Sequence, residues 1–136
     1  MCFFYTYFFK GISLVIANID KISLTEEYKL DDAEIIIISY GLPVRASYRA
    51  VDFARKEGIK VGIFRLITVW PFPDEKVKEV VKNVKAVIVP ELNYTGFIAE
   101  QVERVTQLEI PVIRIPKVCE FHHPDDILKV IKEVEK

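Results

Sequence analysis

Four consecutive isoleucines at residues 35–38, followed by Tyr40 and Gly41, constrain the fold more than any other stretch of the chain. An apolar run without polar alternation predicts a strand buried on both faces, as in the middle of a parallel sheet covered by helices on both sides. A helix is expected directly afterwards. Gly41 can adopt backbone angles closed to other residues, Pro43 has a φ suited to a first helical turn, and Gly58 can end the helix. Strand-turn-helix units of this kind place ligands and partners at the carboxyl ends of their strands.

The same strand-helix pattern recurs along the rest of the chain. Apolar runs predict parallel strands near residues 35–40, 61–67, 86–90 and 112–115, with amphipathic helices between them. Thr95 is expected to cap the helix after the third run, and Pro124 to open the last helix. The polar stretch 20–32 is interpreted as a linker or a short edge strand. Repeats of this type predict an α/β fold, a three-layer α/β/α sandwich around a mostly parallel sheet.

The first nineteen residues, MCFFYTYFFKGISLVIANI, differ in composition from the domain expected over residues 20–136. Lys10 divides the apolar run, and neither half reaches the roughly 18 to 20 apolar residues that a membrane span needs. A membrane or signal segment is therefore not favoured. Three alternatives stay open: an edge strand of the sheet, a segment that docks on a second copy, or a start codon placed upstream of the true domain. Exposed aromatic residues favour association, so we expect a homo-oligomer.

Composition and motifs exclude several classes of function. A net charge of −1 and the lack of a basic stripe argue against nucleic-acid binding. The glycines are too scattered for a phosphate loop or a dinucleotide fingerprint. Cys119, His122 and His123 suggest a metal site, but a closed zinc site needs four ligands, so a loop is the preferred interpretation. Two cysteines far apart in sequence suit a reduced interior, and we expect a cytoplasmic protein.

Polar residues at the strand ends are the first candidate site. Tyr40, Arg65, Glu91 and Asn93 each follow a buried apolar run, so we expect them at the carboxyl edge of the sheet. The preferred interpretation is structural: Arg65 and Glu91 neutralise each other, and Tyr40 and Asn93 hydrogen-bond to loop backbone. The alternative is a binding crevice.

The segment Trp70-Pro71-Phe72-Pro73 is the second candidate. Two prolines around a large aromatic residue exclude regular structure. Trp70 is expected either to pack over the sheet edge, where its loss would cost roughly 3 to 5 kcal/mol if the indole is buried, or to fill an interface with a partner.

These residues also carry a resemblance to a known family. The isoleucine run into Tyr40-Gly41, Arg45-Ala46, Gly58-Ile59-Lys60-Val61-Gly62, Arg65 through Pro73 and Glu91-Leu92-Asn93 together resemble the transketolase carboxy-terminal-like domain of 2-oxoacid:ferredoxin oxidoreductase alpha subunits. The resemblance covers residues 22–134, and its most specific part is the Trp-Pro-Phe-Pro segment spaced after Arg65. It implies a five-stranded sheet with an antiparallel strand at one edge. It also implies that thiamine diphosphate, magnesium and iron-sulfur clusters are held by other domains or subunits of the parent complex.

The chain departs from the family pattern in ways that bear on function. Gly96 is followed by Phe97 where relatives usually carry glutamine, and the domain that normally precedes this one in the alpha subunit is missing. The expected function is therefore a non-catalytic structural or assembly domain, or a truncated alpha subunit, that associates with other oxidoreductase subunits. The alternative is a stand-alone module that binds a small molecule or acyl-CoA in the crevice near Gly41 and Glu91.

We expect no catalytic, cofactor-binding or metal-binding residue in the chain itself, and whether the chain takes part in an enzyme is left open. The candidate interface and crevice residues are Tyr40, Gly41, Arg45, Arg65, Trp70, Pro71, Phe72, Pro73, Glu91, Asn93 and Gly96.

Overall fold

A five-stranded sheet forms the centre of the domain in the computed structural model, which describes residues 3–136, with side chains from Phe9 onward. The strands lie in the order β1-β3-β2-β4-β5. β1 pairs antiparallel with β3 at one edge, and every other pair is parallel. The strand bounds are β1 Thr25–Tyr28, β2 Ile35–Ser39, β3 Val61–Leu66, β4 Ala86–Glu91 and β5 Val112–Pro116. The four predicted parallel strands and the antiparallel edge strand are confirmed.

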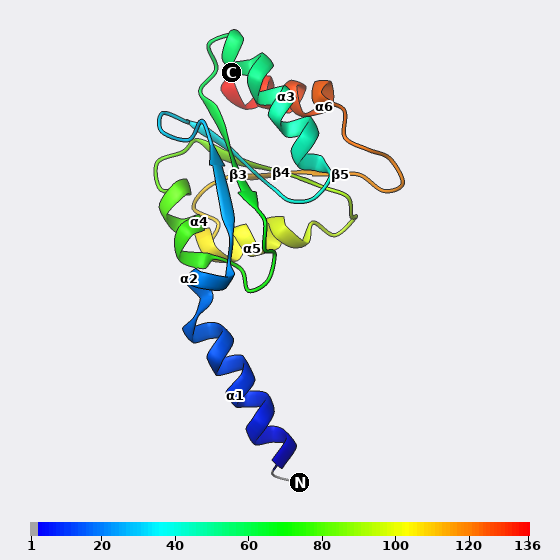
Figure 1. The fold of residues 1–136 in the computed structure, drawn as a ribbon. Coiled ribbons are helices and arrows are strands. Elements are labelled where there is room, and N and C mark those ends of the chain that lie inside the picture. Colours follow the sequence, from blue (N-terminus) through cyan, green and yellow to red (C-terminus); the bar gives the residue numbers. More distant parts are fainter. Residues whose placement is uncertain (1–2) are drawn as a thin grey trace.

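Helices cover both faces of this sheet (Figure 1). On one face, α3 (Pro43–Lys56) and α6 (Pro124–Glu135) pack over Ile35 and Ile37. On the other face, α4 (Asp74–Val81) and α5 (Phe97–Thr106) pack over Ile36 and Ile38. All four isoleucines are at most 1% exposed, because alternate side chains of a strand point to opposite faces and both faces are covered. The predicted three-layer α/β/α sandwich is confirmed.

The chain turns from strand to helix where the sequence predicted. Gly41 has a φ of +62° in the turn after β2, a conformation that costs glycine little. Pro43 is the first residue of α3 and Pro124 the first residue of α6. Gly58, with a φ of +87°, lies two residues beyond the end of α3. These four positions set the directions in which α3 and α6 leave the sheet.

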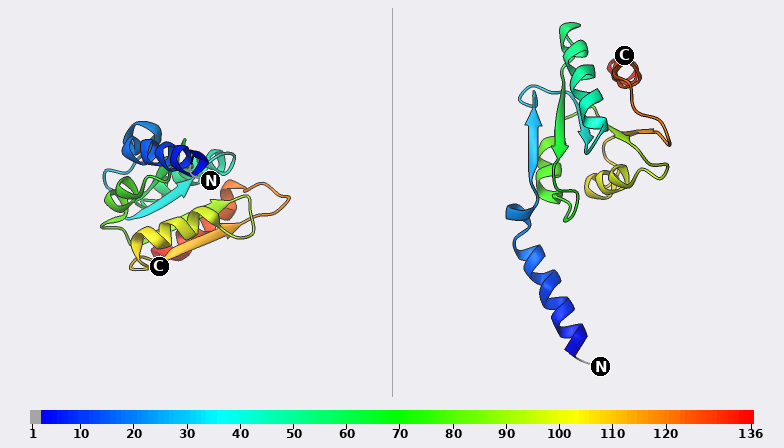
Figure 2. Two further views of the ribbon diagram at one scale, coloured as in Figure 1. Left: turned by 90° about the horizontal axis from the view of Figure 1, so that it is seen from below. Right: turned by 45° about the vertical axis from the view of Figure 1, so that its right-hand side comes forward.

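Residues 3–17 form a helix, α1 (Phe3–Ala17), and not an edge strand, so the edge-strand alternative for the first segment is wrong. A short helix, α2 (Ile19–Ile22), joins α1 to β1. Figure 1 and the right-hand view of Figure 2 show α1 extending away from the domain. Within residues 3–136, no helix is both long and apolar enough to cross a membrane.

The antiparallel direction of β1 decides where α1 and α2 lie. Thr25, the first residue of β1, is paired with Leu66, the last residue of β3. The segment before β1 therefore lies at the carboxyl edge of the parallel strands, on the same side as the loops that follow β2, β3, β4 and β5. All the candidate residues except the helical Arg45 come from this edge.

Candidate functional site

Glu91, the last residue of β4, is a buried carboxylate that caps the next helix. Its side chain is fully enclosed, with 1% of the residue exposed. One carboxylate oxygen accepts a hydrogen bond from the Ile98 N–H (2.9 Å) and the other from the Ala99 N–H (3.1 Å). These amides belong to the first turn of α5, where backbone N–H groups lack partners within the helix and the helix dipole favours a negative charge. Glu91 therefore positions α5 against the end of β4.

The predicted cap at Thr95 is wrong. The residue before α5 is Gly96, and no side chain at that position makes a capping hydrogen bond. Gly96 has a φ of +75°, and a Cβ there would lie 3.2 Å from Arg114 Cδ and 3.5 Å from a Glu91 carboxylate oxygen. The left-handed φ favours glycine at this position, and a Cβ would also crowd the Arg114 side chain, whereas its distance to Glu91 is an ordinary contact. Sequence reasoning missed this because the cap comes from seven and eight residues upstream and not from the adjacent residue.

Asn93 links Glu91 to Tyr40 of the neighbouring strand. Its Nδ2 donates to Glu91 Oε1 (3.0 Å) and to the Tyr40 hydroxyl (3.4 Å), and its Oδ1 accepts from the Gly96 N–H (2.6 Å). Burial, and then the negative charge of Glu91, raise the pKa of the Tyr40 phenol, which therefore stays protonated at neutral pH. The structure brings Tyr40, Glu91, Asn93 and Gly96 together at the carboxyl edge, in a network that fixes the loop between β4 and α5.

Arg65 does not pair with Glu91, so that part of the structural interpretation is wrong. Its guanidinium contacts Glu26 at 2.8 Å, on the antiparallel edge strand β1. The sheet order explains the difference, because β2 lies between β3, which carries Arg65, and β4, which carries Glu91. Adjacent strands are about 4.8 Å apart, so two strand spacings separate the two side chains.

An apolar crevice lies beside this network at the carboxyl edge. A cavity of about 260 Å³ is lined by Leu42, Pro43, Ala46, Leu92 and Phe121, with Arg45 and His122 as its polar residues. His122 Nε2 is within 2.7 Å of the Ile115 carbonyl oxygen, and Arg45 is exposed. The crevice thus has a mainly hydrocarbon wall and a single cation, and Glu91 is turned away from it toward α5.

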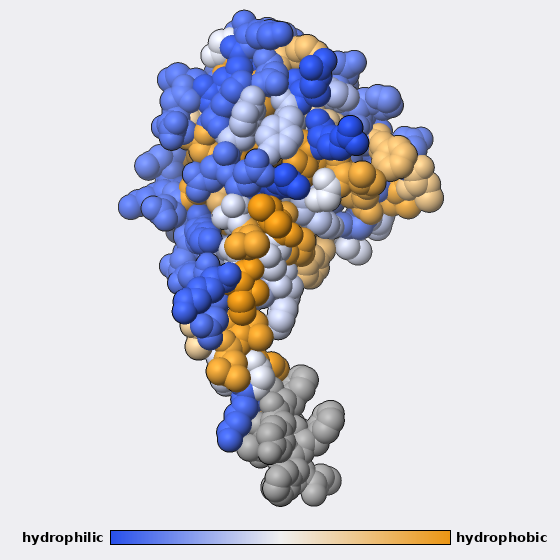
Figure 3. Space-filling view, viewed as in Figure 1, coloured by the Kyte–Doolittle hydropathy of each residue, from blue (hydrophilic) through white to orange (hydrophobic). Residues whose placement is uncertain are grey.

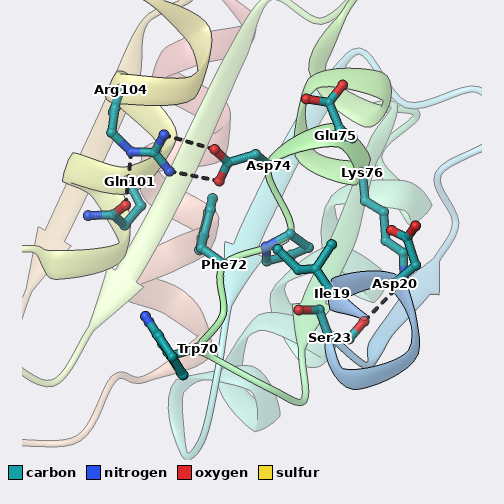
Figure 4. A pocket seen from close by; sticks show the side chains of 11 residues that line it. Ile19, Asp20, Ser23, Trp70, Phe72, Asp74, Glu75, Lys76, Gln101 and Arg104 are labelled. Carbon is teal, nitrogen blue, oxygen red and sulfur yellow. Dashed lines mark hydrogen bonds and ion pairs between the residues drawn. The ribbon is translucent and has the colours of Figure 1, made fainter. Parts of the chain in front are cut away.

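The Trp70–Pro73 corner has the irregular backbone that its prolines predict, but its two aromatic rings behave in opposite ways. Phe72 is 8% exposed and belongs to the core under α4 and α5, whereas Trp70 is 65% exposed. Figure 4 shows the two rings pointing apart. Of the two alternatives for Trp70, packing of a buried indole is therefore wrong and the interface remains a prediction, while Phe72 is the residue that anchors the corner.

Hydrogen bonds attach the corner to the elements around it. The Ser23 hydroxyl donates to the Pro71 carbonyl at 2.6 Å, and Lys76 Nζ donates to the Ser23 carbonyl at 3.0 Å. Asp74, at the start of α4, accepts two hydrogen bonds from Arg104 of α5 (2.7 and 2.8 Å). A cavity of about 360 Å³ remains between these groups, with Trp70 at its mouth (Figure 4).

The remaining polar loop, residues 119–123, is a connection to the last helix in this structure. His123 is the N-cap of α6 and exchanges capping hydrogen bonds with Asp126. Cys119 is exposed, with a φ of +64°. Over residues 3–136, no group of three or more His, Cys, Asp or Glu side chains is arranged to hold a metal ion. Two described carboxylates at the carboxyl edge of the sheet already have partners: Glu91 caps α5, and Glu26 pairs with Arg65. These residues do not fit a magnesium diphosphate cradle.

The sheet order and the antiparallel edge strand define a transketolase carboxy-terminal-like domain. A split-gene transketolase in the form of an inactive beta4 tetramer shares the fold, with a TM-score of 0.67 and 18% identity over 80% of this chain and 41% of the other. The chain belongs to the family of pyruvate:ferredoxin oxidoreductase core domain II, whose model matches residues 33–120. The resemblance inferred from the sequence is thereby confirmed.

Individual relatives agree with this assignment. The chain is 38% identical to the 2-oxoglutarate synthase subunit KorA of Methanothermobacter marburgensis over 82% of this chain and 30% of the relative. It is 41% identical to KorA of Methanocaldococcus jannaschii over 84% of this chain and 30% of the relative. It also matches the 2-oxoglutarate:ferredoxin oxidoreductase of Magnetococcus marinus, solved with 2-oxoglutarate, coenzyme A and succinyl-CoA bound, with a TM-score of 0.70 and 25% identity over 88% of this chain and 21% of that one. The chain spans about a third of the length of the two KorA subunits.

Proposed function

We propose that this chain is a non-catalytic assembly domain, or a truncated alpha subunit, of a thiamine-diphosphate-dependent 2-oxoacid:ferredoxin oxidoreductase. The observation that carries the proposal is the family match over residues 33–120. Thiamine diphosphate, magnesium and iron-sulfur clusters then belong to other parts of the complex. The division into a segment 1–19 and a domain 20–136, and a cytoplasmic location, are parts of the same proposal.

The chemistry at the carboxyl edge supports a structural role. In an active site we would expect ionisable groups directed at an open crevice, whereas Glu91 and Asn93 are directed at the backbone of α5 and its preceding loop. Decarboxylation of a 2-oxoacid needs an electron sink at the carbonyl carbon, which the thiamine ring supplies when it is bound. The contribution of this domain is a rigid carboxyl edge, with α5 held to the sheet by Glu91.

The test compares assembly with catalysis. The chain is coexpressed with the remaining subunits of a KorA-type complex, which carry an affinity tag. We expect the untagged chain to copurify with them in a stoichiometric amount. Incubated alone with thiamine diphosphate, magnesium, coenzyme A, a panel of 2-oxoacids and a viologen dye, it is expected to reduce no more dye than a heat-killed control. Dye reduction, or calorimetric binding of thiamine diphosphate to the chain alone, would overturn the proposal.

A further inference from the structure

Exposed large apolar side chains form a continuous strip where α1 and α2 join the sheet. The strip consists of Ile22, Leu24, Ile67 and Trp70, which are 37%, 54%, 52% and 65% exposed. Its members are neighbours across two chain segments, because the Ile67 N–H donates to the Leu24 carbonyl and the Thr68 hydroxyl donates to the Ile22 carbonyl. In the space-filling view of Figure 3 the surface along this junction is strongly apolar.

The helix α1 leaves the domain at this strip and carries the same kind of surface. Leu14 and Ile16 are 66% and 62% exposed, and Lys10 is the one charged residue in the sequence of α1. The helix is rich in Phe, Tyr, Ile and Val, which are weaker helix formers than Ala or Leu. A helix of about 15 residues is marginal in water without tertiary packing. The stability of α1 therefore depends on a covering surface.

α1 cannot cover the strip of its own chain, because it points away from the domain (Figures 1 and 2). A twofold axis near residue 15 would cover both the exposed strip and the apolar surface of α1. It lays α1 of each chain antiparallel to α1 of the other and brings the far end of each helix to the other chain's strip. With 15 residues, α1 is about 22 Å long, which is enough to reach across that junction. A twofold contact of this kind is closed and limits assembly to a dimer.

Charge and buried area both favour a second copy of the chain as the molecule that covers the strip and α1. Lys10 in α1 and Asp20 in α2 carry opposite charges, and neither has an ion-pair partner within the described part of the chain, so two copies can pair them across the contact. The exposed portions of the strip residues with Leu14 and Ile16 amount to on the order of 100 Å² each. The resulting apolar area of roughly 600 Å² per chain is most of the about 800 Å² that a stable interface buries on each partner. The net charge of −1 leaves two copies with little mutual repulsion.

We propose that the chain forms a twofold dimer in which α1 of each copy packs along α1 and the apolar strip of the other. Neither this association nor its test requires other oxidoreductase subunits. The dimer buries the mouth of the cavity beside Trp70, and Trp70 becomes part of the contact. The single tryptophan of the sequence therefore reports on the interface directly.

The experiment measures mass and tryptophan exposure together on the full chain. Light scattering and sedimentation are followed over about 1 to 100 µM, with acrylamide quenching of Trp70 at each concentration. We compare the wild-type chain with the double variant Leu14→Asp/Ile16→Asp. The matched control is Leu108→Asp, because Leu108 is 74% exposed, lies in the turn after α5 and is outside the proposed contact.

We expect a wild-type dimer whose Trp70 becomes more accessible to acrylamide on dilution. The double variant is expected to raise the dimer dissociation constant at least roughly 100-fold, with Trp70 accessible at every concentration, whereas Leu108→Asp matches the wild type. A wild-type monomer at the highest concentration would overturn the proposal. So would a dimer that the double variant leaves intact, or binding of the wild-type monomer to lipid vesicles with the same shielding of Trp70.

Discussion

The substitution Glu91→Gln tests whether the buried carboxylate holds α5 to the sheet. The glutamine carbonyl can replace the oxygen that accepts from Ile98 and Asn93, but its amide NH₂ then faces the Ala99 N–H, which now lacks an acceptor. Losing one hydrogen bond to a charged group costs about 1.5 to 3 kcal/mol. The lost interaction with the helix dipole adds roughly 0.5 kcal/mol. We therefore expect Glu91→Gln to lower the free energy of unfolding by about 2 to 3 kcal/mol.

The assay is urea unfolding followed by far-UV circular dichroism at one fixed protein concentration. A loss of this size is a large fraction of the about 5 to 15 kcal/mol that stabilises a typical domain, and it lowers Tm by roughly 10 °C. The matched control is Glu120→Gln, which removes the same charge from a side chain that is 73% exposed and is expected to change the unfolding free energy by less than about 0.5 kcal/mol. If Glu91→Gln and Glu120→Gln have equal effects, the carboxylate does not anchor α5 and the structural account of Glu91 is refuted.

Three further predictions test other parts of the structure. Phe72→Ala and Trp70→Ala are compared in the Leu14→Asp/Ile16→Asp variant by urea unfolding followed by circular dichroism. Phe72→Ala is expected to lower the free energy of unfolding by about 3 to 4 kcal/mol and Trp70→Ala by less than about 1 kcal/mol, because only the Phe72 ring is buried. The reverse order would contradict the geometry of the corner. In urea unfolding, Gly96→Ala is expected to lower the free energy of unfolding by about 1 to 2 kcal/mol more than Gly41→Ala. Both glycines have a positive φ, but only at Gly96 would a Cβ meet Arg114. Equal losses would show that this crowding is unimportant. Lys85 and Lys60 lower the pKa of Glu34 from its ordinary 4.5 to about 2, so its stabilising contribution is present above pH 4.5 and is lost as the pH falls toward 2. Glu34→Gln is therefore expected to flatten the acid side of the stability profile, less so in 1 M salt, and a profile that matches the wild type would contradict this ion-pair network.

Local sequence patterns predict much of the fold because the determinants are themselves local. The isoleucine run predicts a strand buried on both faces, and Pro43 and Pro124 mark the helix starts, as the structure confirms. The partner of Arg65 depends instead on strand order, which a single run of residues does not encode. The cap of α5 is likewise not visible in the local sequence, since Glu91 accepts from amides seven and eight positions later in the chain and takes the role expected of Thr95.

The aromatic residues show the same limit. Trp70 and Phe72 are two positions apart between prolines, and both are large and apolar, so composition gives no reason to bury one and expose the other. The direction of each ring follows from two contacts that fix the corner: the hydrogen bond from the Ser23 hydroxyl to the Pro71 carbonyl, and the packing of Phe72 in the core. The sequence analysis therefore assigns the packing role to the wrong ring of the corner.

The antiparallel edge strand has a practical consequence for experiments on this protein. It sends the chain into the sheet at the carboxyl edge, while α6 ends near the opposite edge, where Glu135 contacts Lys85 just before β4. The helix α1 and the end of α6 thus lie at opposite poles of the molecule (Figure 1). A tag or surface linkage at Lys136 leaves the apolar pole free in solution, whereas a fusion at the other end obstructs it. Immobilised through its last residue, the chain presents all copies in the same orientation, with the apolar pole directed outward.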